Sequence, residues 1–347
     1  MAVHYTSRDD EKGMAMKTRS KVGIGCLAIV LAIAGFVAWN IFNIEPRPIV
    51  VAEPGENGER VMLGDVPANF YPGVGEGPRP GLLLLGGSEG GLKDYRNDLA
   101  RQLAAEGYSV IYPGYFETSE DNRPFDMVPL ETFDDALDWL GTREDVDAGR
   151  IGVVGHSKGA EGALIVATRS PEVKAVVAAM PSDVVWEGFH FYSFTYEPES
   201  SWTAGGEPLP YVEYIVPPWY EWMSGSAGTI AEMYRNSWSA RDQYPGSEIP
   251  VENIQAPILM VCGEQDTIWH GCDMGRSIQA RAPNSELLVY EDAGHWAFGV
   301  PTGLNQEDRE TLGSIGGTAE ADLAAREDQW PRILGFLETA LSPAPEQ

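Results

Sequence analysis

The stretch IGVVGHSKGAEGALIVATR, residues 151–169, decides the fold. Its first four residues form an apolar run with the length and composition of a strand that is buried on both faces. A helix-like segment follows from residue 159, so the G-x-S-x-G pattern between Gly155 and Gly159 falls at a strand-to-helix turn. The two glycines suit a turn that is too crowded for a Cβ. The stretch therefore predicts that Ser157 is a nucleophile at the carboxyl end of a strand.

Strands and helices alternate on both sides of this motif. Short apolar runs recur at residues 81–85, 108–112, 175–179, 258–261 and 287–290, and helical spacing recurs at residues 93–107, 129–140 and 330–337. Because parallel strands are joined by crossover helices, this alternation predicts helices on both faces of an open sheet. The predicted fold class is α/β, with a doubly wound, mostly parallel sheet.

A serine hydroxyl needs a base to accept its proton and an acid to orient that base. In this architecture the acid and then the histidine follow the serine at later strand ends. Asp266 and His295 each follow such a strand, so Ser157, Asp266 and His295 are the predicted catalytic residues. Glu264 is the alternative acid.

The remaining histidines are weaker candidates for the base, and they are His4, His156, His190 and His270. His156 adjoins the nucleophile and is expected to pack or to form a hydrogen bond. The side chain of Lys158 is expected to be solvated, with a salt bridge to Glu161 as the alternative.

An oxyanion is stabilised by two N–H donors. The backbone N–H of Lys158, directly after the nucleophile, is one predicted donor. The second is expected from the glycine-rich loop at residues 86–91, with Ser88 as the predicted donor and Glu89 as the alternative. This loop lacks the spacing of a phosphate-binding loop or a dinucleotide fingerprint, and no cofactor is expected.

Aromatic residues gather between the strands at 175–179 and 258–261. Residues 189–244 hold 14 of the 35 aromatic residues in the chain. They form either an extra packing layer or a cap insertion, at about 189–250, whose apolar wall lines a pocket. On the second interpretation, Trp186, Trp202 and Trp219 are predicted to bind substrate.

Composition limits the partners of this chain of 347 residues. Acidic residues outnumber basic ones by 52 to 24, which gives a net charge of −28 and argues against nucleic-acid binding. No pattern of metal ligands is present in the sequence, and no metal is expected. Of the three cysteines, Cys262 and Cys272 could pair in an oxidising compartment, but a buried free Cys262 is the more ordinary outcome.

The N-terminus predicts attachment to a membrane. Residues 22–42 carry no charge and as a helix would span about 30 Å, and lysines and arginines precede them. The positive-inside rule then places residues 1–21 in the cytoplasm, followed by a transmembrane helix at 22–42, a tether at 43–60 and an extracytoplasmic catalytic domain at 61–347. The alternative is a secreted protein, released by signal cleavage after an Ala-Ile-Ala sequence.

Several segments resemble one known family. They are PGLLLLGGSEGG at residues 80–91, the stretch from residue 152 to 189, EIPVENIQAPILMVCGEQDTIW at 248–269 and WPRILGFL at 330–337. These segments resemble the C-terminal catalytic domain of the acyl-CoA thioesterase and bile acid-CoA:amino acid N-acyltransferase family, in the α/β-hydrolase superfamily. The resemblance implies an α/β-hydrolase fold with a triad at Ser157, Asp266 and His295.

The resemblance also implies the reaction, which is hydrolysis of acyl thioesters through an acyl-enzyme. The acyltransferase branch of the family uses a cysteine nucleophile, so Ser157 favours hydrolysis over amide formation. Residues 44–347 hold 19 basic and 49 acidic residues. The resulting charge of −30 repels acyl-CoA, which is anionic, and argues against it as the substrate. The alternative is therefore a carboxylesterase or dienelactone-hydrolase-like enzyme for uncharged esters, ahead of an acyltransferase or a non-catalytic binding protein.

Overall fold

The computed structural model describes residues 29–36, 39, 46–190, 197–218, 220, 228–301 and 311–343. The chain divides into two units, a small one of Met1–Arg47 with Phe191–Tyr196, and a large one of Pro48–His190 with Glu197–Gln347. In the small unit, residues 29–36 are helical. The large unit carries the sheet.

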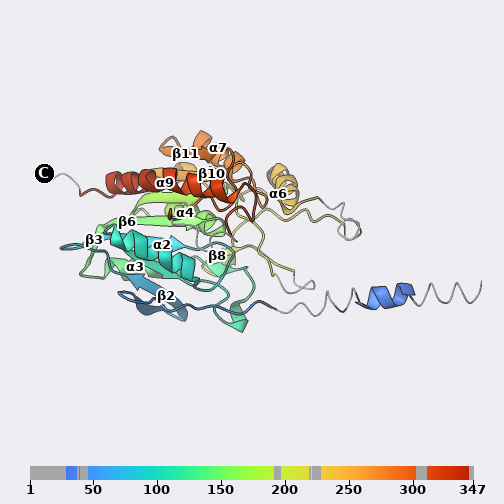
Figure 1. Cartoon of the computed structure of the whole chain (residues 1–347), viewed down its shortest axis with the longest axis horizontal. Helices are drawn as coiled ribbons and strands as arrows, with labels where there is room; N and C mark the ends of the chain where they lie inside the picture. The colour runs from blue at the N-terminus through green and yellow to red at the C-terminus, as the bar shows by residue number, and fades with distance from the viewer. Residues whose placement is uncertain are drawn as a thin grey trace, which may run out of the picture. The chain divides into compact units, whose positions relative to one another are not determined.

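An eight-stranded sheet organises the large unit (Figure 1). Its strands in spatial order are β1 (Glu59–Leu63), β2 (Val66–Tyr71), β4 (Ser109–Pro113), β3 (Arg79–Leu85), β6 (Val146–His156), β7 (Val173–Ala179), β10 (Ile258–Gly263) and β11 (Ser285–Tyr290). Strand β2 pairs antiparallel with β1 and β4, and all other neighbours are parallel. The order turns back between β3 and β6, so the doubly wound, mostly parallel sheet is confirmed.

Helices cover both faces of this sheet. On one face lie α2 (Asp94–Ala105) and α9 (Ala319–Ala340), and on the other lie α3 (Glu131–Gly141) and α4 (Lys158–Arg169). Alternate residues of β3 divide between the two cores, because Leu83 and Leu85 face α3 and α4 while Leu82 and Leu84 face α2 and α9. Burial on both faces explains why the strands read as continuous apolar runs.

Strand β6 is longer than the sequence predicts. It starts at Val146, not at Ile151, because Val146 and Asp147 pair with the beginning of β3 and an irregularity in the ladder follows. Helix α9 also begins well before the predicted segment, where the Thr318 side chain accepts a hydrogen bond from the N–H of Ala321.

An insertion separates β7 from β10. It contains β8 (Trp202–Ala204), β9 (Glu207–Pro208) and α6 (Ile230–Ser239), and β8 joins β9 and β5 (Val128–Pro129) in a second sheet. Helix α7 (Gly271–Arg281) follows β10, and the short 3₁₀ helices are Glu120–Asn122, Arg241–Gln243 and Val251–Asn253. A cap at 189–250 stays a prediction, since residues 191–196, 219 and 221–227 lie outside the described part.

The predicted membrane span falls largely outside the described residues. Of positions 22–42, only 29–36 and 39 are described. Within the ranges that the structure describes, no helix is both long enough and apolar enough to cross a bilayer. The span therefore stays a prediction.

Candidate active site

Ser157 lies at the turn between β6 and α4. Its backbone angles, φ 58° and ψ −123°, fall where residues with a Cβ are strained. The flanking glycines are required by close backbone contact: a Cβ on Gly155 would collide with the carbonyl of Gly159, and a Cβ on Gly159 with that of Gly86. The local sequence thus forces Ser157 into a sharp turn at the carboxyl end of the sheet.

Asp266 and His295 meet at the ends of two adjacent strands. Because β10 and β11 are parallel neighbours, the loops that follow them emerge side by side. The Nδ1 of His295 lies 2.6 Å from Oδ2 of Asp266, and both side chains are buried. The carboxylate can accept a hydrogen bond from Nδ1–H, and in the neutral imidazole with this tautomer Nε2 is the nitrogen that can act as a base.

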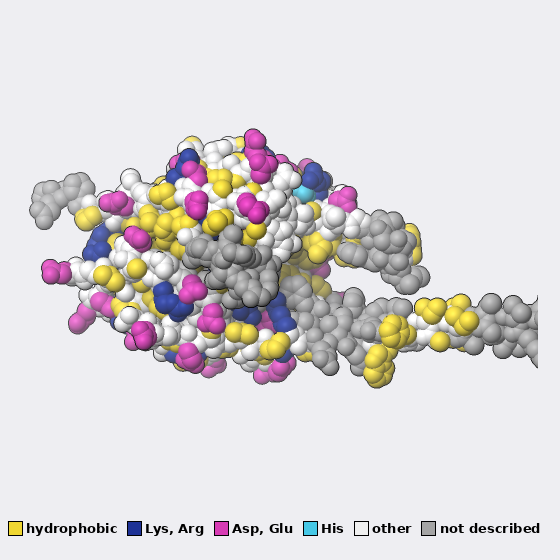
Figure 2. Space-filling model, viewed as in Figure 1, with side chains coloured by type: hydrophobic (Ala, Val, Ile, Leu, Met, Phe, Trp, Pro, Cys, Tyr) yellow, Lys and Arg dark blue, Asp and Glu magenta, His cyan; other side chains and the backbone are white. Residues whose placement is uncertain are grey.

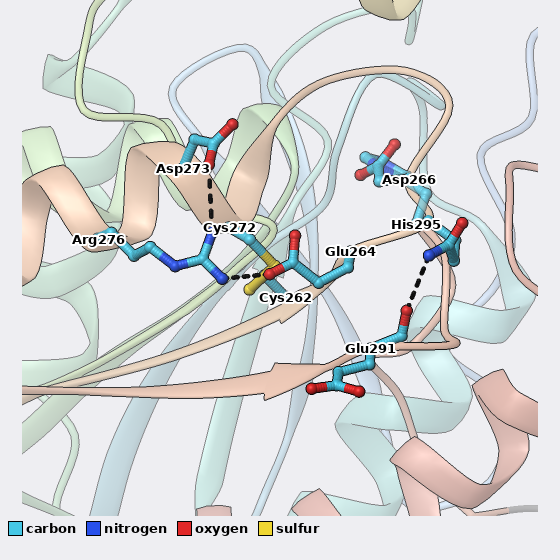
Figure 3. Close-up of a disulfide and its surroundings, with 9 residues drawn as sticks. Cys262, Glu264, Asp266, Cys272, Asp273, Arg276, Glu291 and His295 are labelled. Carbon is cyan, nitrogen blue, oxygen red and sulfur yellow. Dashed lines mark hydrogen bonds and ion pairs between the residues drawn. A yellow bond between two sulfur atoms is a disulfide. The ribbon is translucent and has the colours of Figure 1, made fainter.

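Glu264, the alternative acid, is directed elsewhere. Its carboxylate binds the guanidinium of Arg276, which also contacts Asp273. Figure 3 shows Glu264 turned toward α7, while Asp266 lies on the far side of the same loop beside His295. The structure therefore brings the predicted acid, and not the alternative, to the histidine.

His156 connects the serine turn to the histidine loop. Its Nε2 lies 3.0 Å from the backbone oxygen of His295, and its Nδ1 lies 2.5 Å from Nη2 of Arg96. Because a guanidinium only donates, Nδ1 must accept and Nε2–H must donate to the carbonyl. Burial, reinforced by the charge of Arg96, lowers the pKa of His156 well below its ordinary value. His156 is therefore a neutral connector, and the expectation that it forms a hydrogen bond is confirmed.

Arg96 extends this connection to the glycine-rich loop. Its Nε donates to Oε1 of Glu89 over 2.7 Å, and both side chains are largely buried. Burial alone would raise the pKa of Glu89, but the charge and hydrogen bond of Arg96 lower it below the ordinary value. The pair is therefore ionised. Sequence reasoning missed it, and the only available signal was a carboxylate inside a glycine-rich loop.

The predicted oxyanion donors flank the serine. Lys158 is the first residue of α4, and the loop that holds Ser88 passes directly over Ser157. A Cβ on Gly87 would lie 3.1 Å from the Cβ of Ser157 and equally close to the carbonyl of His156. The assignment of the backbone N–H groups of Lys158 and Ser88 as donors stays a prediction.

The family can now be assigned. Residues 128–343 match the protein-family model described as BAAT / Acyl-CoA thioester hydrolase C terminal. The chain belongs to this family. It is 26% identical over 302 residues to acyl-coenzyme A thioesterase 5 of Mus musculus, covering 83% of this chain and 66% of that protein. It is 27% identical over 299 residues to bile acid-CoA:amino acid N-acyltransferase of Mus musculus, covering 84% and 67%.

Solved structures agree with the assigned fold. A putative dienelactone hydrolase from Klebsiella pneumoniae matches with a TM-score of 0.51 and 19% identity, covering 81% of this chain and 97% of that one. An acylaminoacyl peptidase matches with a TM-score of 0.52 and 12% identity, covering 84% and 42%. At these identities the likeness shows the fold alone. The chain therefore has the α/β-hydrolase fold and belongs to a family of thioesterase-like enzymes, and it spans about two thirds of the length of the curated relatives it matches.

The side chain of Lys158 is buried in this enzyme, so the expectation that it is solvated is wrong. Its Nζ lies 2.6 Å from Oε2 of Glu161 and 2.7 Å from Oγ of Ser201, which confirms the alternative salt bridge. The other oxygen of Glu161 accepts hydrogen bonds from the N–H of Trp186 and from the indole of Trp202. Helix α4 is thereby attached to the insertion.

Two of the three predicted substrate-binding tryptophans lie in the described part of the chain. Trp186 and Trp202 are fully buried, and the ring of Trp202 packs 5.1 Å from that of Phe125 and 5.8 Å from that of Phe133. This environment is the one expected of an added packing layer. Trp219 lies outside the described residues. Substrate binding by the three tryptophans stays a prediction.

Cys262 and Cys272 form a disulfide, so the expectation of a free Cys262 is wrong (Figure 3). The chain leaves the end of β10 and returns to begin α7 beside it, which brings the two Cα atoms to 5.2 Å, well within disulfide range. A spacing of ten residues gives no sign of this return.

Among the described residues, no cluster of three or more His, Cys, Asp or Glu side chains could hold a metal.

Proposed function

We propose that this enzyme is a serine hydrolase that cleaves acyl thioesters through an acyl-enzyme on Ser157. The observation that carries the proposal is the strained turn of Ser157 beside the buried Asp266–His295 pair. A strained serine at a strand-to-helix turn, with a carboxylate-oriented histidine on a neighbouring loop, is the arrangement that nucleophilic catalysis needs.

Each of these groups has a defined role in the proposed reaction. The Ser157 hydroxyl attacks the thioester carbonyl while Nε2 of His295 accepts its proton, and Asp266 stabilises the imidazolium. The tetrahedral oxyanion is held by backbone N–H groups of Lys158 and the loop at residues 86–91. The leaving sulfur takes the proton from His295 and departs as a thiol. The same histidine then removes a proton from water, which attacks the acyl ester, and returns that proton to the Ser157 oxygen as the acid is released.

Two arguments bear on the leaving group. The relatives' names refer to acyl-coenzyme A substrates, which supports a thioester. The charge of −30 on residues 44–347 opposes a polyanion, and it supports an uncharged ester as the second candidate substrate.

We further propose that the catalytic domain is extracytoplasmic and anchored by residues 22–42, with secretion after signal cleavage as the alternative. The disulfide supports this placement, because such bonds persist mainly in oxidising compartments. This location would also separate the enzyme from intracellular acyl-CoA.

The test compares the full chain in detergent with its Ser157→Ala variant. Initial rates are measured on palmitoyl-CoA and on p-nitrophenyl esters of matching chain length. We expect Ser157→Ala to lower kcat by at least about 10³-fold on whichever substrate is preferred. Ser239→Ala, which removes an exposed hydroxyl on α6, should match the wild type. Full activity of Ser157→Ala would refute the proposal, and the ratio of the two substrates decides between thioester and ester.

A further inference from the structure

The disulfide encloses the loop that carries the predicted catalytic acid. Cys262 belongs to the end of β10 and Cys272 to the first turn of α7, and both are buried. Asp266 lies on the chain between them (Figure 3). The cross-link therefore closes the base of a loop whose tip points its carboxylate at His295.

The two sides of this loop are held in different ways. The first side, Glu264 and Gln265, is fixed by backbone hydrogen bonds to the chain that follows β11. The N–H of Glu264 donates to the oxygen of Tyr290 over 3.0 Å, and the N–H of Gln265 donates to that of Ala293 over 2.9 Å. This side of the loop would keep its place without a disulfide.

The second side is the one that orients the acid. Oδ1 of Asp266 accepts hydrogen bonds from the N–H of Ile268 at 2.8 Å and of Trp269 at 3.3 Å. These two donors hold the carboxylate so that its other oxygen faces Nδ1 of His295. The chain then runs directly into α7, where Cys272 is bonded to the strand.

We propose that the Cys262–Cys272 disulfide is a positioning element for catalysis, which holds the second side of the loop so that Asp266 keeps its orientation toward His295. The proposal rests on the proposed function for the role of Asp266. Without the cross-link the donors at Ile268 and Trp269 are tied to the sheet less directly, and the carboxylate gains freedom to turn.

The same element makes the activity sensitive to reductants. Dithiothreitol supplies two electrons and two protons to the S–S bond, which yields two thiols, and itself closes to a cyclic disulfide. The ion pair of Arg276 with Glu264 connects the loop to α7 independently of the disulfide. We therefore expect the reduced enzyme to stay folded while losing activity, and to recover when oxidised glutathione re-forms the bond.

The test is a double-mutant cycle on the full chain. The pair Cys262→Ala/Cys272→Ala, the variant Asp266→Ala and their combination are assayed for kcat and KM, with folding checked by circular dichroism. We expect removal of the disulfide to lower kcat about 10- to 100-fold with KM little changed, and to have almost no further effect when Asp266 is already absent. Cys26→Ala, which removes the remaining cysteine, is the matched control. Equal losses with and without Asp266 would overturn the proposal.

A second measurement does not depend on the substrate. The proton shared by Nδ1 of His295 and Asp266 should give a far-downfield proton resonance that disappears in Asp266→Ala. We expect this resonance to weaken or shift in the doubly substituted cysteine variant. An unchanged resonance in the folded cysteine variant overturns the positioning role of the disulfide, whatever substrate the enzyme acts on. Full activity of the Ser157→Ala variant, by contrast, refutes only the proposed function.

Discussion

Replacing His156 with glutamine removes a buried base while keeping its two hydrogen bonds. The amide oxygen can accept from Arg96, and the amide nitrogen can donate to the backbone oxygen of His295, as the ring atoms do. Burial and the charge of Arg96 lower the pKa of His156 well below its ordinary 6.5, so the folded protein keeps this ring neutral as the pH falls. The unfolded chain, by contrast, takes up the proton near pH 6.5.

The sign and size of the effect follow from this difference. Because the unfolded state binds more protons, the free energy of unfolding falls as the pH drops below 6.5, and it continues to fall until the folded pKa is reached. Each pH unit well inside this window removes about 1.4 kcal/mol, so the loss between pH 6.5 and 5.0 is at most about 2 kcal/mol. His156→Gln should lack this contribution, although the lost ring packing lowers its stability at pH 8.

Urea unfolding at pH 8.0, 6.5 and 5.0 measures the difference between wild type and variant. The matched control is Phe298→Leu. The ring of Phe298 stacks 5.8 Å from that of His156, so loss of the phenyl ring weakens the same packing but leaves the titrating imidazole of His156 in place. Phe298→Leu should be less stable than wild type by a similar amount at all three pH values. If His156→Gln loses stability toward pH 5.0 as steeply as the wild type does, the neutral-connector interpretation is wrong.

Three further predictions concern folding and topology. Lys158→Met should lower the free energy of unfolding by about 3–5 kcal/mol in urea, since it leaves the buried Glu161 without its cation, and adding Glu161→Leu should restore part of the loss. Gly159→Ala should be destabilised by about 3 kcal/mol or fail to fold, while Gly141→Ala, whose added Cβ has only one contact at 3.9 Å, should unfold at the wild-type temperature. Protease added to intact cells should digest residues 44–347, and full protection would contradict the proposed topology.

The sequence predicted those parts of the site that depend on short segments. The turn at Ser157 is dictated by glycines within two residues, and the positions of Asp266 and His295 follow from strand ends that parallel pairing must bring to one edge. Both can be deduced without knowing how distant segments pack.

What the sequence did not predict are contacts between segments that are far apart in the chain. Lys158 meets Ser201, 43 residues later, and Arg96 meets His156, 60 residues later, so neither partner is visible in a local pattern. An isolated lysine after a nucleophile is ordinarily solvated, and only the insertion folding against α4 makes its burial favourable. The disulfide was missed for a different reason, because its cysteines are only ten residues apart and its formation depends on the path of the loop between them.

These long-range contacts connect the groups that are proposed to react. The backbone of His156 leads directly into Ser157, while its ring holds the carbonyl of His295 and receives the guanidinium of Arg96. Arg96 in turn holds Glu89 in the loop that passes over the serine. A displacement of any one loop must therefore strain a buried hydrogen bond to the next, and such bonds are costly to leave unmade. In the proposed mechanism, the spacing of nucleophile, base and oxyanion loop is thus set by side chains that take no part in the reaction.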